Sequence, residues 1–578
     1  MKPRLVRCVV AALLLSVTVL PARAISAEPP SRSVMPPRPL CCGNGVALQG
    51  DRLFMNHAAL DRISRINVDT RSIKVLASER DPDDEELVTP DDLWIDRKTG
   101  DIYVTEILVN RVTRISPDGT RTTIVAGFAD GTAHPNAITG LRRKGEDLRL
   151  FITMVSFEPD SKTGIYEIDP QRRFPPRLVY GAAGGQVIYG HGMRAPNAME
   201  FDRRGRRLYV PETYGGNVYA VDVDEHTARL VYRGRSKTTN ATAVRFARDG
   251  SLLYAEQSSG RLLRLDPKGP ASQEPEVIAR LNPGIDGIAE HRDGRIFLSN
   301  FRFGGLSVVH NSGRVSQLFR LSLSLPNGVT PLEDGRIAVA DLGSLALVNP
   351  NRERRRLSRP KQFLRDNFDI AVGVATTGGC DVYATGFFRG TLQHVDVCEP
   401  SKPHTEIVRR RTFVAAWDIA ARDSELWVTD ATGSVYHVTG VNGADQARAR
   451  LLLSGLANPT GIAIGDGVLY VSESDGDQIR RIDPVTGATT GVITGLDEPE
   501  GLAVEADGSI VVVEAGAGQL VRVRPDGERE VVLHDLKTNI RGIGPLAFVN
   551  FYSDVALTAR GDILVTLPKK GSLLEVSD

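Results

Sequence analysis

One local pattern recurs along the whole chain and restricts the possible folds more than any other feature. Each copy has a polar residue, an apolar run, a tight turn ending in glycine and a second apolar run. Examples are Asn197-Ala-Met-Glu-Phe-Asp-Arg-Arg-Gly-Arg-Arg-Leu-Tyr-Val and Glu500-Gly-Leu-Ala-Val-Glu-Ala-Asp-Gly-Ser-Ile-Val-Val. Asp-Gly turns are typical of β-hairpins, because glycine accepts the positive φ that a tight turn needs. The chain is therefore predicted to be a series of β-hairpin units.

Twelve such units align along the chain, spaced by 40 to 61 residues. Their leading positions are Asn44, Asp92, Asn136, Asn197, Thr242, Asp286, Asn327, Asp369, Asp418, Thr460, Glu500 and Ser553. This spacing is close to the roughly 40–50 residues of a four-stranded propeller blade, and segments with a helical period are absent. One propeller ring usually holds about four to eight blades. We therefore predict an all-β protein with two tandem six-bladed β-propellers, at residues 41–318 and 319–578.

The N-terminus has the pattern of a secretory signal peptide. Basic residues precede an apolar run from Cys8 to Leu20, and the small-residue site Ala22-Arg23-Ala24 follows. Residues 1–24 are predicted to be removed near Ala24, and the proline-rich residues 25–40 to form a linker. Because the apolar run is shorter than the roughly 20 residues of a membrane-spanning helix, no membrane span is predicted. The mature protein is expected to be secreted or periplasmic.

The charge balance argues against a polyanionic partner. The chain has 71 basic and 71 acidic side chains, for a formal net charge of zero. Nucleic-acid and acidic-membrane partners normally require a basic surface patch. No nucleic-acid partner is predicted.

The cysteines suit an oxidising compartment. Cys380 and Cys398 flank a predicted hairpin, where a cross-strand disulfide is plausible. Cys41 and Cys42 are adjacent, so a bridge between them would be strained, and intermolecular pairing or free thiols stay open.

The blade pattern resembles the six-bladed propellers of the senescence-marker-protein/gluconolactonase group, with its NHL-like, strictosidine-synthase-like and paraoxonase-like relatives. Pro196-Asn197-Ala198, Asp286-Gly287-Ile288 and Asn327-Gly328-Val329 are similar to the turns that carry metal ligands in the gluconolactonase family. Cys42-Gly43-Asn44-Gly45 is similar to that family's Cys-Gly-Glu-Gly segment, with Asn44 in place of its glutamate. Thr242 stands where the family has an aspartate. The resemblance implies a divalent-cation site and lactone hydrolysis.

The leading positions of the first ring supply oxygen atoms to the mouth of its predicted channel. We predict that Asp92, Asn136, Asn197 and Asp286 are metal ligands. Calcium takes six to eight oxygen ligands from carboxylates, amides and water, so Ca²⁺ is the expected cofactor. The alternative is local, because Asn and Asp at the start of a strand often satisfy backbone groups of the preceding turn.

The second ring offers an alternative metal site at Asn327, Asp369, Asp418, Thr460, Glu500 and Ser553, three of which are carboxylates. Glu500 is a candidate catalytic residue, because a carboxylate there replaces the Asn or Thr of other turns. The choice between the two rings stays open at this point.

A cation at the channel mouth would polarise a carbonyl group and lower the pKa of a bound water, as lactone or ester hydrolysis requires. His134 and His191 precede Asn136 and Asn197, and they resemble the histidine pair of paraoxonase-like lactonases. They are the candidate bases, and the alternative is that they are turn histidines. No Gly-x-Ser-x-Gly motif supports a serine hydrolase.

The sequence thus predicts a secreted, divalent-cation-dependent hydrolase of lactones or related esters. A non-catalytic propeller that binds a protein, glycan or envelope partner is the main alternative. A cyclic-ester lyase is another, because streptogramin lyases share this type of fold. Glu106, Glu212 and Glu256 recur at the end of the second strand and are predicted to make structural hydrogen bonds.

Overall fold

The computed structural model of the chain describes most residues after position 28. The described residues are 29–35, 40, 42–77, 87–128, 133–156, 163–183, 186–234, 240–301, 304–319, 323–342, 344–349, 371–387, 390–399, 405–408, 412–441, 447–538, 540–541 and 550–577. The predicted signal peptide at 1–24 lies outside them, as do Cys41 and Asp369.

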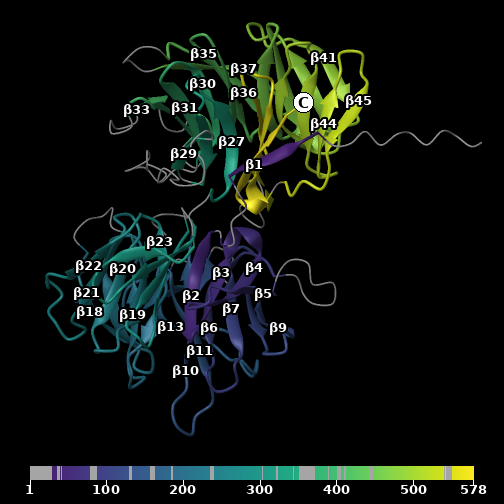
Figure 1. Cartoon of the computed structure of the whole chain (residues 1–578). Coiled ribbons are helices and arrows are strands. Elements are labelled where there is room, and N and C mark those ends of the chain that lie inside the picture. Colours follow the sequence, from purple (N-terminus) through teal and green to yellow (C-terminus); the bar gives the residue numbers. More distant parts are fainter. Residues whose placement is uncertain are drawn as a thin grey trace, which may run out of the picture.

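β-Strands make up nearly all of the regular secondary structure in the described residues. Figure 1 shows them gathered into two bodies, one above the other. Twelve antiparallel sheets of three to five described strands follow one another along the chain. One ring closes where β2 (Gly43–Gln49) contacts β23 (Ile285–Glu290), and the other where β27 (Pro326–Pro331) contacts β48 (Val555–Leu557). The prediction of two tandem six-bladed propellers is confirmed.

The described residues contain no α-helix, and three short 3-10 turns lie between their strands. These are η1 (Ala58–Leu60), η2 (Ser474–Gly476) and η4 (Pro568–Lys570). In this part of the chain, no helix has the length and apolar character needed to cross a membrane.

The first propeller runs from β2 to β26, and each blade adds its strands in chain order from the channel outward. Blades one to three contain β2 (Gly43–Gln49), β3 (Arg52–His57), β4 (Arg62–Asn67) and β5 (Ile73–Ala77); β6 (Pro90–Ile95), β7 (Ile102–Glu106), β8 (Arg111–Ile115) and β9 (Arg121–Ala126); and β10 (His134–Leu141), β11 (Arg149–Val155), β12 (Gly164–Ile168), β13 (Arg177–Ala183) and β14 (Gln186–Tyr189). Blades four to six contain β15 (Glu200–Phe201), β16 (Leu208–Pro211), β17 (Val218–Asp222) and β18 (Thr227–Tyr232); β19 (Ala241–Phe246), β20 (Leu252–Glu256), β21 (Arg261–Leu265) and β22 (Glu276–Arg280); and β23 (Ile285–Glu290), β24 (Ile296–Asn300), β25 (Leu306–Val309) and β26 (Val315–Gln317).

The second propeller follows the same order from β27. Blades seven to nine contain β27 (Pro326–Pro331), β28 (Ile337–Asp341) and β29 (Ser344–Val348); β30 (Ala371–Gly378), β31 (Asp381–Gly386), β32 (Thr391–Asp396) and β33 (Thr405–Val408); and β34 (Ala416–Arg422), β35 (Glu425–Asp430), β36 (Ser434–Thr439) and β37 (Arg448–Ser454). Blades ten to twelve contain β38 (Pro459–Gly465), β39 (Val468–Glu473), β40 (Gln478–Ile482) and β41 (Thr489–Thr494); β42 (Pro499–Val504), β43 (Ile510–Glu514), β44 (Gln519–Val523) and β45 (Arg529–Leu533); and β48 (Val555–Leu557), β49 (Ile563–Leu567) and β50 (Ser572–Val576). β46 (Ile540–Arg541) pairs with β47 (Asn550–Phe551) between the last two blades.

The N-terminal strand β1 (Ser31–Met35) belongs to the second propeller, although it lies in the segment that the sequence predicted to be a linker. β1 pairs antiparallel with β50 and forms the outer strand of blade twelve, and Figure 1 shows it in purple beside the yellow C-terminal strands. Met35 packs into the apolar cluster that joins blades twelve and seven. The linker prediction is wrong for these residues, because β50 has an open edge that an extended segment can pair with.

Apolar side chains fill the space between adjacent blades, as alternation on two-sided strands predicts. Between blades one and two, for example, Phe54 and Ile63 pack against Leu93 and Val104. Each fully buried side chain of this size contributes about 1.5–3 kcal/mol. The stability of each ring therefore lies in the contacts between its blades.

The innermost strands carry a β-bulge at their first residues. In ten blades, two adjacent strands shift register at the start of the inner one; in blade two, for example, this happens between Pro90 and Leu93. A bulge leaves its extra residue unpaired and turns the side chain out of the pleat. We call the first unpaired residue at this register shift the leading residue; it lies at the channel end of the innermost strand.

The bulged ends of the two propellers face one another. Cys42, Leu60 and Phe301 of the first propeller pack with Leu325, Leu342 and Phe551 of the second. All six lie beside the starts of innermost strands or the ends of second strands. The two channel mouths with leading residues therefore lie on the sides where the propellers meet.

Candidate functional site

The bulge register corrects one predicted leading residue in the first ring. The unpaired pair in blade two is Asp91 and Asp92, and Asp91 follows the first paired residue, Pro90. Asp91 is thus equivalent to Asn136, which follows Pro135. Sequence analysis missed Asp91, but alignment on the preceding proline would have found it. The leading residues of the first ring are Asn44, Asp91, Asn136, Asn197, Thr242 and Asp286.

Four of these six residues come from blades that are neighbours in the ring. Blades six, one, two and three contact in that order through β23, β2, β6 and β10, and they carry Asp286, Asn44, Asp91 and Asn136. One side of the channel mouth therefore has two carboxylates and two amides.

The side chains on this side of the mouth have more acceptor oxygens than donors. Asn44 Nδ2 donates to Asp91 Oδ1 at 2.5 Å. Among the described residues, no donor reaches the buried Oδ1 atoms of Asn44, Asn136 and Asp92. Buried oxygens without donors are costly in a folded protein unless water or a cation contacts them. This pattern fits a hard cation, which binds carboxylate and amide oxygens.

The local environment makes the carboxylates unusually hard to ionise. Burial raises the pKa of Asp91 to about 7; the hydrogen bond from Asn44 opposes this rise, and the charge of Asp92 adds to it. Burial also raises the pKa of Asp286 well above its usual value, and the charges of Asp91 and Asp92 raise it further. Water reaches part of each side chain, although protein surrounds both. A divalent cation in the channel would offset this repulsion.

Asp92, which was predicted to be a metal ligand, holds three blades together. Its Oδ2 atom accepts a hydrogen bond from the Ile138 amide of blade three at 3.1 Å. Gly45 of blade one lies against it, since a Cβ atom at Gly45 would be only 2.4 Å from Asp92 Oδ1. Burial raises the pKa of Asp92, and the charge of Arg245 opposes the rise. Asp92 has a clear structural role, and its Oδ1 atom remains beside the mouth.

Hydroxyl groups on the second strands fix where the leading residues stand. Thr105 of blade two donates to the Asn136 carbonyl of blade three at 2.5 Å. Ser299 of blade six donates in the same way to the Asn44 carbonyl of blade one, across the seam that closes the ring. These bonds tie the backbone of a leading residue to the neighbouring blade, so the mouth is preorganised.

The other two leading residues already use their side-chain oxygens in hydrogen bonds. Asn197 Oδ1 accepts from the Ala198 amide at 2.8 Å, as expected for the local alternative. The Thr242 hydroxyl donates to the Ile285 carbonyl at 3.0 Å. The structure therefore places the predicted ligand Asn197 on the side of the mouth opposite Asn44 and Asp91, with its acceptor already engaged.

The second ring differs from its predicted composition. β30 begins at Ala371, and its bulge makes Val372 the leading residue, while Asp369 lies outside the described residues. In blade nine the leading residue is Trp417, one position before Asp418. The second ring thus has two leading residues without oxygen in their side chains, which the sequence alignment missed.

An aromatic cluster fills the second ring beside its acidic residues. Trp417, Tyr552 and Phe387 are almost completely buried and pack together. Burial raises the pKa of Asp418 to about 7, and burial followed by the charge of Asp418 raises that of Asp554 well above its usual value. Asp418 and Asp554 each accept an amide from the next blade, as Asp92 does in the first ring. These carboxylates are structural.

Glu500, predicted as a catalytic candidate, is completely buried in the second ring. Its Oε2 atom accepts from the Ser553 amide of blade twelve at 2.8 Å, and its carbonyl accepts from the Ser472 hydroxyl of blade ten. Glu500 therefore connects three consecutive blades.

The two predicted base residues differ in how they are held. His134 is buried, with Nδ1 bonded to Asn110 Oδ1 at 2.8 Å. His191 Nδ1 lies 3.0 Å from the Tyr180 hydroxyl, and its ring also contacts Tyr219. Among the described residues, no hydrogen-bond partner reaches the buried Nε2 atom of His191. Neither of these two hydrogen bonds, to Asn110 and to Tyr180, involves a leading residue.

The structural role predicted for the repeated glutamates is confirmed for two of them. Glu106 accepts from the Val88 amide at 2.7 Å, and Glu212 accepts from the Arg194 amide at 2.9 Å. Glu256 is held by the Ser259 hydroxyl and by Arg261.

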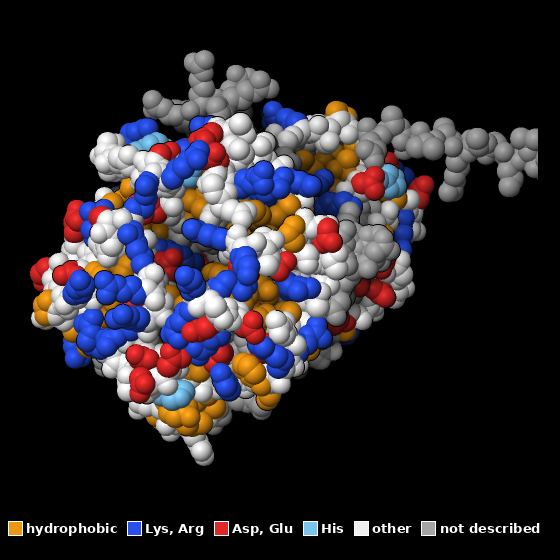
Figure 2. Space-filling view, turned by 90° about the horizontal axis from the view of Figure 1, so that it is seen from below, with side chains coloured by type: hydrophobic (Ala, Val, Ile, Leu, Met, Phe, Trp, Pro, Cys, Tyr) orange, Lys and Arg blue, Asp and Glu red, His pale blue; other side chains and the backbone are white. Residues whose placement is uncertain are grey.

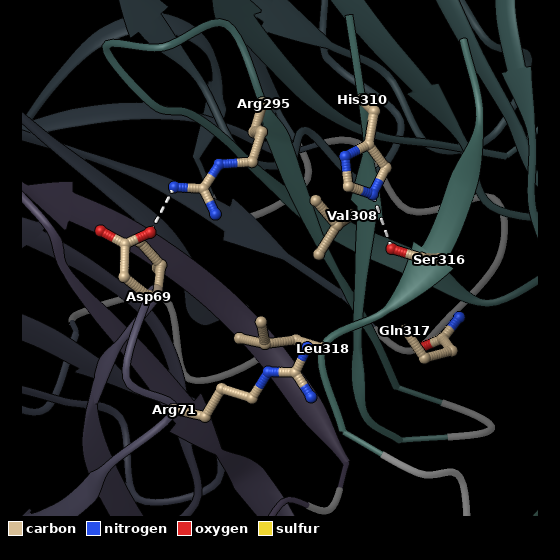
Figure 3. A pocket seen from close by; sticks show the side chains of 9 residues that line it. Asp69, Arg71, Arg295, Val308, His310, Ser316, Gln317 and Leu318 are labelled. Carbon is tan, nitrogen blue, oxygen red and sulfur yellow. Dashed lines mark hydrogen bonds and ion pairs between the residues drawn. The ribbon is translucent and has the colours of Figure 1, made fainter. Parts of the chain in front are cut away.

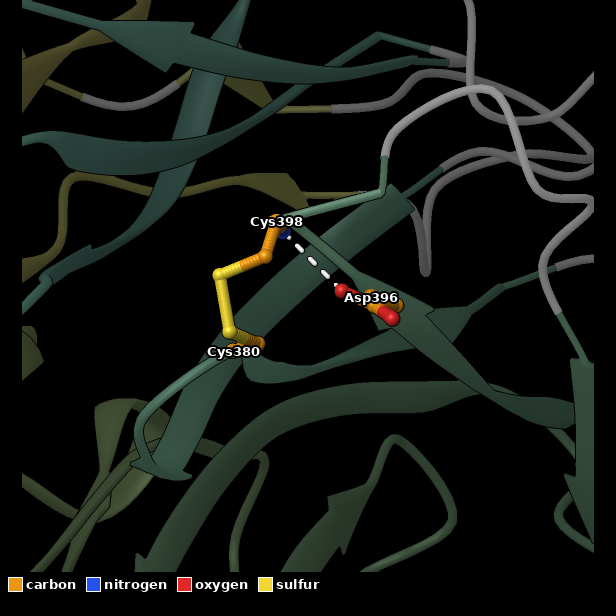
Figure 4. A group of neighbouring side chains, drawn as sticks. All are labelled: Cys380, Asp396 and Cys398. Atoms are coloured by element: carbon orange, nitrogen blue, oxygen red, sulfur yellow. Dashed lines mark hydrogen bonds between the residues drawn. A yellow bond between two sulfur atoms is a disulfide. The ribbon is translucent and has the colours of Figure 1, made fainter.

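The cysteines form disulfides rather than a metal site. Cys380 and Cys398 are bonded to each other, as the hairpin predicted, and Cys42 is bonded to a cysteine outside the described residues. Cys380, Asp396 and Cys398 are the one described group of three His, Cys, Asp or Glu ligand atoms within 4.8 Å of one another, and Figure 4 shows the disulfide within it. A cation at the channel mouth would therefore need amide oxygens as well as carboxylates.

A cavity of about 200 Å³ lies at the outer side of the seam between blades six and one. Figure 3 shows two pairs among its polar groups: Arg295 with Asp69 at 2.6 Å, and His310 with the Ser316 hydroxyl at 2.8 Å. It is smaller than a typical ligand pocket.

Comparison with known proteins finds similarity to solved structures alone. No family model matches the sequence, and no curated protein matches it. Among solved structures, virginiamycin B lyase from Staphylococcus aureus is 11% identical, with a TM-score of 0.23 over 66% of this chain and 94% of that one. The calcium-binding protein regucalcin from Agrobacterium tumefaciens is 14% identical, with a TM-score of 0.33 over 47% of this chain and 85% of that one.

The extracellular domain of a one-component system from B. thetaiotaomicron spans both propellers of this chain. It is 12% identical, with a TM-score of 0.30 over 92% of this chain and 69% of that one. Identities and TM-scores this low leave the functional argument to the residues of the chain itself.

Proposed function

We propose that the protein is a secreted hydrolase of lactones or related esters that depends on a divalent cation held in the first propeller. One observation carries the proposal. Acceptor oxygens from four neighbouring blades meet at a channel mouth where, among the described residues, no donor reaches three of them. Such a set fits Ca²⁺ better than it fits water alone.

The residues that would hold the cation are Asn44, Asp91, Asn136 and Asp286, with Asp92 Oδ1 beside them. A bound divalent cation supplies a Lewis acid that polarises a carbonyl oxygen and lowers the pKa of water. The Thr105 hydroxyl donates to the backbone carbonyl of Asn136, and the Ser299 hydroxyl donates to that of Asn44. These hydrogen bonds between neighbouring blades fix the backbone of both residues before a substrate arrives.

The first ring is a better candidate than the second because its mouth combines oxygens with water access. Asp91 and Asp286 are partly exposed. The second ring places the buried aromatics Trp417 and Tyr552 at the equivalent level. We therefore assign the activity to the first propeller.

His134 and His191 are the proposed proton acceptors, and among the described residues no hydrogen-bond partner reaches the buried Nε2 atom of His191. Tyr180 and Tyr219 hold the ring in a fixed orientation. We include secretion in the proposal because of the basic and apolar pattern of residues 1–24.

The test is hydrolysis of a panel of lactones and aryl esters by the mature protein, after EDTA treatment and again with calcium restored. Asp91→Asn and Asp286→Asn should abolish both turnover and calcium binding measured by calorimetry. Asp418→Asn is the matched control, because it removes a carboxylate with a similarly raised pKa from the second ring. It should keep the calcium response.

No turnover and no calcium binding across the panel would contradict the proposal and favour a non-catalytic propeller. Calcium binding that survives Asp91→Asn but not Asp418→Asn would move the site to the second ring. Elimination products in place of hydrolysis products would identify a lyase.

A further inference from the structure

The hairpins between the first and second strands of each blade lie at the end of the propeller opposite the bulges. In the first propeller they are residues 50–51, 96–101, 142–148, 202–207, 247–251 and 291–295. In the second they are residues 332–336, 379–380, 423–424, 466–467, 505–509 and 558–562. The first set has twelve Lys or Arg and eight Asp or Glu, and the second has two and seven. Although the net charge of the chain is zero, the hairpins of the first propeller are therefore mainly basic and those of the second mainly acidic.

Lysine and arginine side chains gather on the face of the molecule seen from below in Figure 2, where the first propeller lies. Eight of its hairpin cations have no carboxylate within 4.0 Å among the described residues; we call them the basic face. They are Arg97, Lys98, Lys144, Arg203, Arg204, Arg206, Arg207 and Arg248. The other four hairpin cations form ion pairs, for example Arg142 with Asp96 at 2.6 Å.

The acidic residues of these hairpins hydrogen-bond to the turns and do not form ion pairs with the basic face. Asp202 Oδ1 accepts from the amides of Arg204 and Arg206. The Arg203 guanidinium donates to the carbonyls of Ala247 and Arg248 in the next blade. These bonds orient the arginines without pairing them with a carboxylate.

The positive charge continues into the channel. Burial raises the pKa of Glu200, and the charges of Arg245, Arg97 and Arg203 oppose this rise. The charge of Arg245 also opposes the rise in the pKa of Asp92, which lies toward the other mouth. Positive charge therefore extends from the basic face toward the channel.

The side chains on this face fit a polymer with carboxylate or sulfate groups. Arginine, which supplies six of the eight cations, binds such groups with two parallel hydrogen bonds. The large exposed hydrophobic side chains of the described residues, such as Val187, Ile188 and Leu451, all lie outside these hairpins. Insertion into a membrane or stacking on single-stranded bases would require apolar or aromatic groups here.

We propose that the basic face binds an acidic polysaccharide and docks the protein on an anionic glycan, with the bulged mouth of the first propeller directed away from it. This inference is independent of catalysis and relies only on the proposed export, which exposes the face to glycans rather than to nucleic acid. Hairpins of four consecutive blades, two to five, present the cations along one arc of the propeller, which suits a repeating polymer.

The experiment measures binding of the full mature chain to immobilised polygalacturonate and dextran sulfate, with neutral dextran as the blank. The variant is Arg97→Glu, Arg204→Glu and Arg248→Glu together, which reverses one exposed cation in each of three blades. The matched control is Lys74→Glu, Arg280→Glu and Arg448→Glu, which makes the same change in net charge on exposed outer-strand positions. Circular dichroism melting verifies that both are folded.

The variant should bind the acidic polysaccharides at least about tenfold more weakly, because each basic residue near an anionic surface contributes roughly fivefold. The control should bind like the unmodified protein, and affinity should fall with salt. Equal weakening in variant and control would overturn the proposal, as would no binding to either acidic polymer. Tighter binding to duplex DNA or to phosphatidylglycerol vesicles would overturn it in favour of those partners.

Discussion

Replacing Asp91 by asparagine should make the calcium-free protein more stable at neutral pH. The pKa of Asp91 is about 7 in the folded protein, against an ordinary value of 3.8. Below about pH 3 the carboxyl group is protonated in both the folded and the unfolded chain, so it does not affect stability there. As the pH rises from 4 to 7, the unfolded chain loses the proton first, and the free energy of unfolding falls.

The magnitude follows from the size of the shift. Each pKa unit corresponds to about 1.36 kcal/mol, so ionised Asp91 lowers the free energy of unfolding at pH 8 by up to about 4 kcal/mol. Asp91→Asn keeps the shape and the contact with Asn44 but cannot ionise. In EDTA, the variant should therefore be more stable than the unmodified protein at pH 8 and equally stable at about pH 3.

Calcium should narrow this difference. At a concentration about 100 times its dissociation constant, calcium stabilises the unmodified protein by about 2.7 kcal/mol, and Asp91→Asn should gain much less. Urea unfolding followed by fluorescence is the assay, with Trp94 as the one tryptophan of the first propeller. A variant that is less stable than the unmodified protein at pH 8 in EDTA would refute the reasoning, since it would show that Asp91 is held as a favourable anion.

Three further changes test the framework of the fold. A mature chain that starts at residue 40 should melt earlier than one that starts at residue 25, in the transition of the second propeller alone, because it lacks β1. Ser472→Ala removes the hydrogen bond to the Glu500 carbonyl and should lower the free energy of unfolding, measured in urea, by about 1 kcal/mol. An unchanged free energy of unfolding would show that this hydrogen bond is not stabilising. Cys380 and Cys398 are 18 residues apart, and replacing both by serine should lower the free energy of unfolding by about 3 kcal/mol. A reducing agent should then cause no further loss of stability in blade eight.

Prediction from sequence succeeded where the signal is local. Asp-Gly turns and alternating apolar residues are properties of a few neighbouring residues, so the twelve blades and their hairpins were predictable. The structural assignment of Glu106 and Glu212 also followed from repetition at one blade position, and their bonds to backbone amides confirm it.

Prediction of the site was less accurate because it depends on register. Whether Asp91 or Asp92 is the leading residue is decided by which residue pairs with β7, and the bulge shifts that pairing by one position. The same shift replaced Asp418 by Trp417 in the second ring, so a predicted ring of oxygens is instead partly aromatic. Both errors come from treating a strand start as regular.

The sequence by itself determined the number of blades, their hairpins and the disulfide between Cys380 and Cys398, because each depends on residues close together in the chain. Only the tertiary structure decided that β1 completes blade twelve, that four neighbouring blades bring acceptor oxygens to one channel mouth, and that the basic face lies on one propeller. These features arise when the rings close, since closure brings together residues that are far apart in sequence, and a zero net charge does not reveal how the charges are distributed in space.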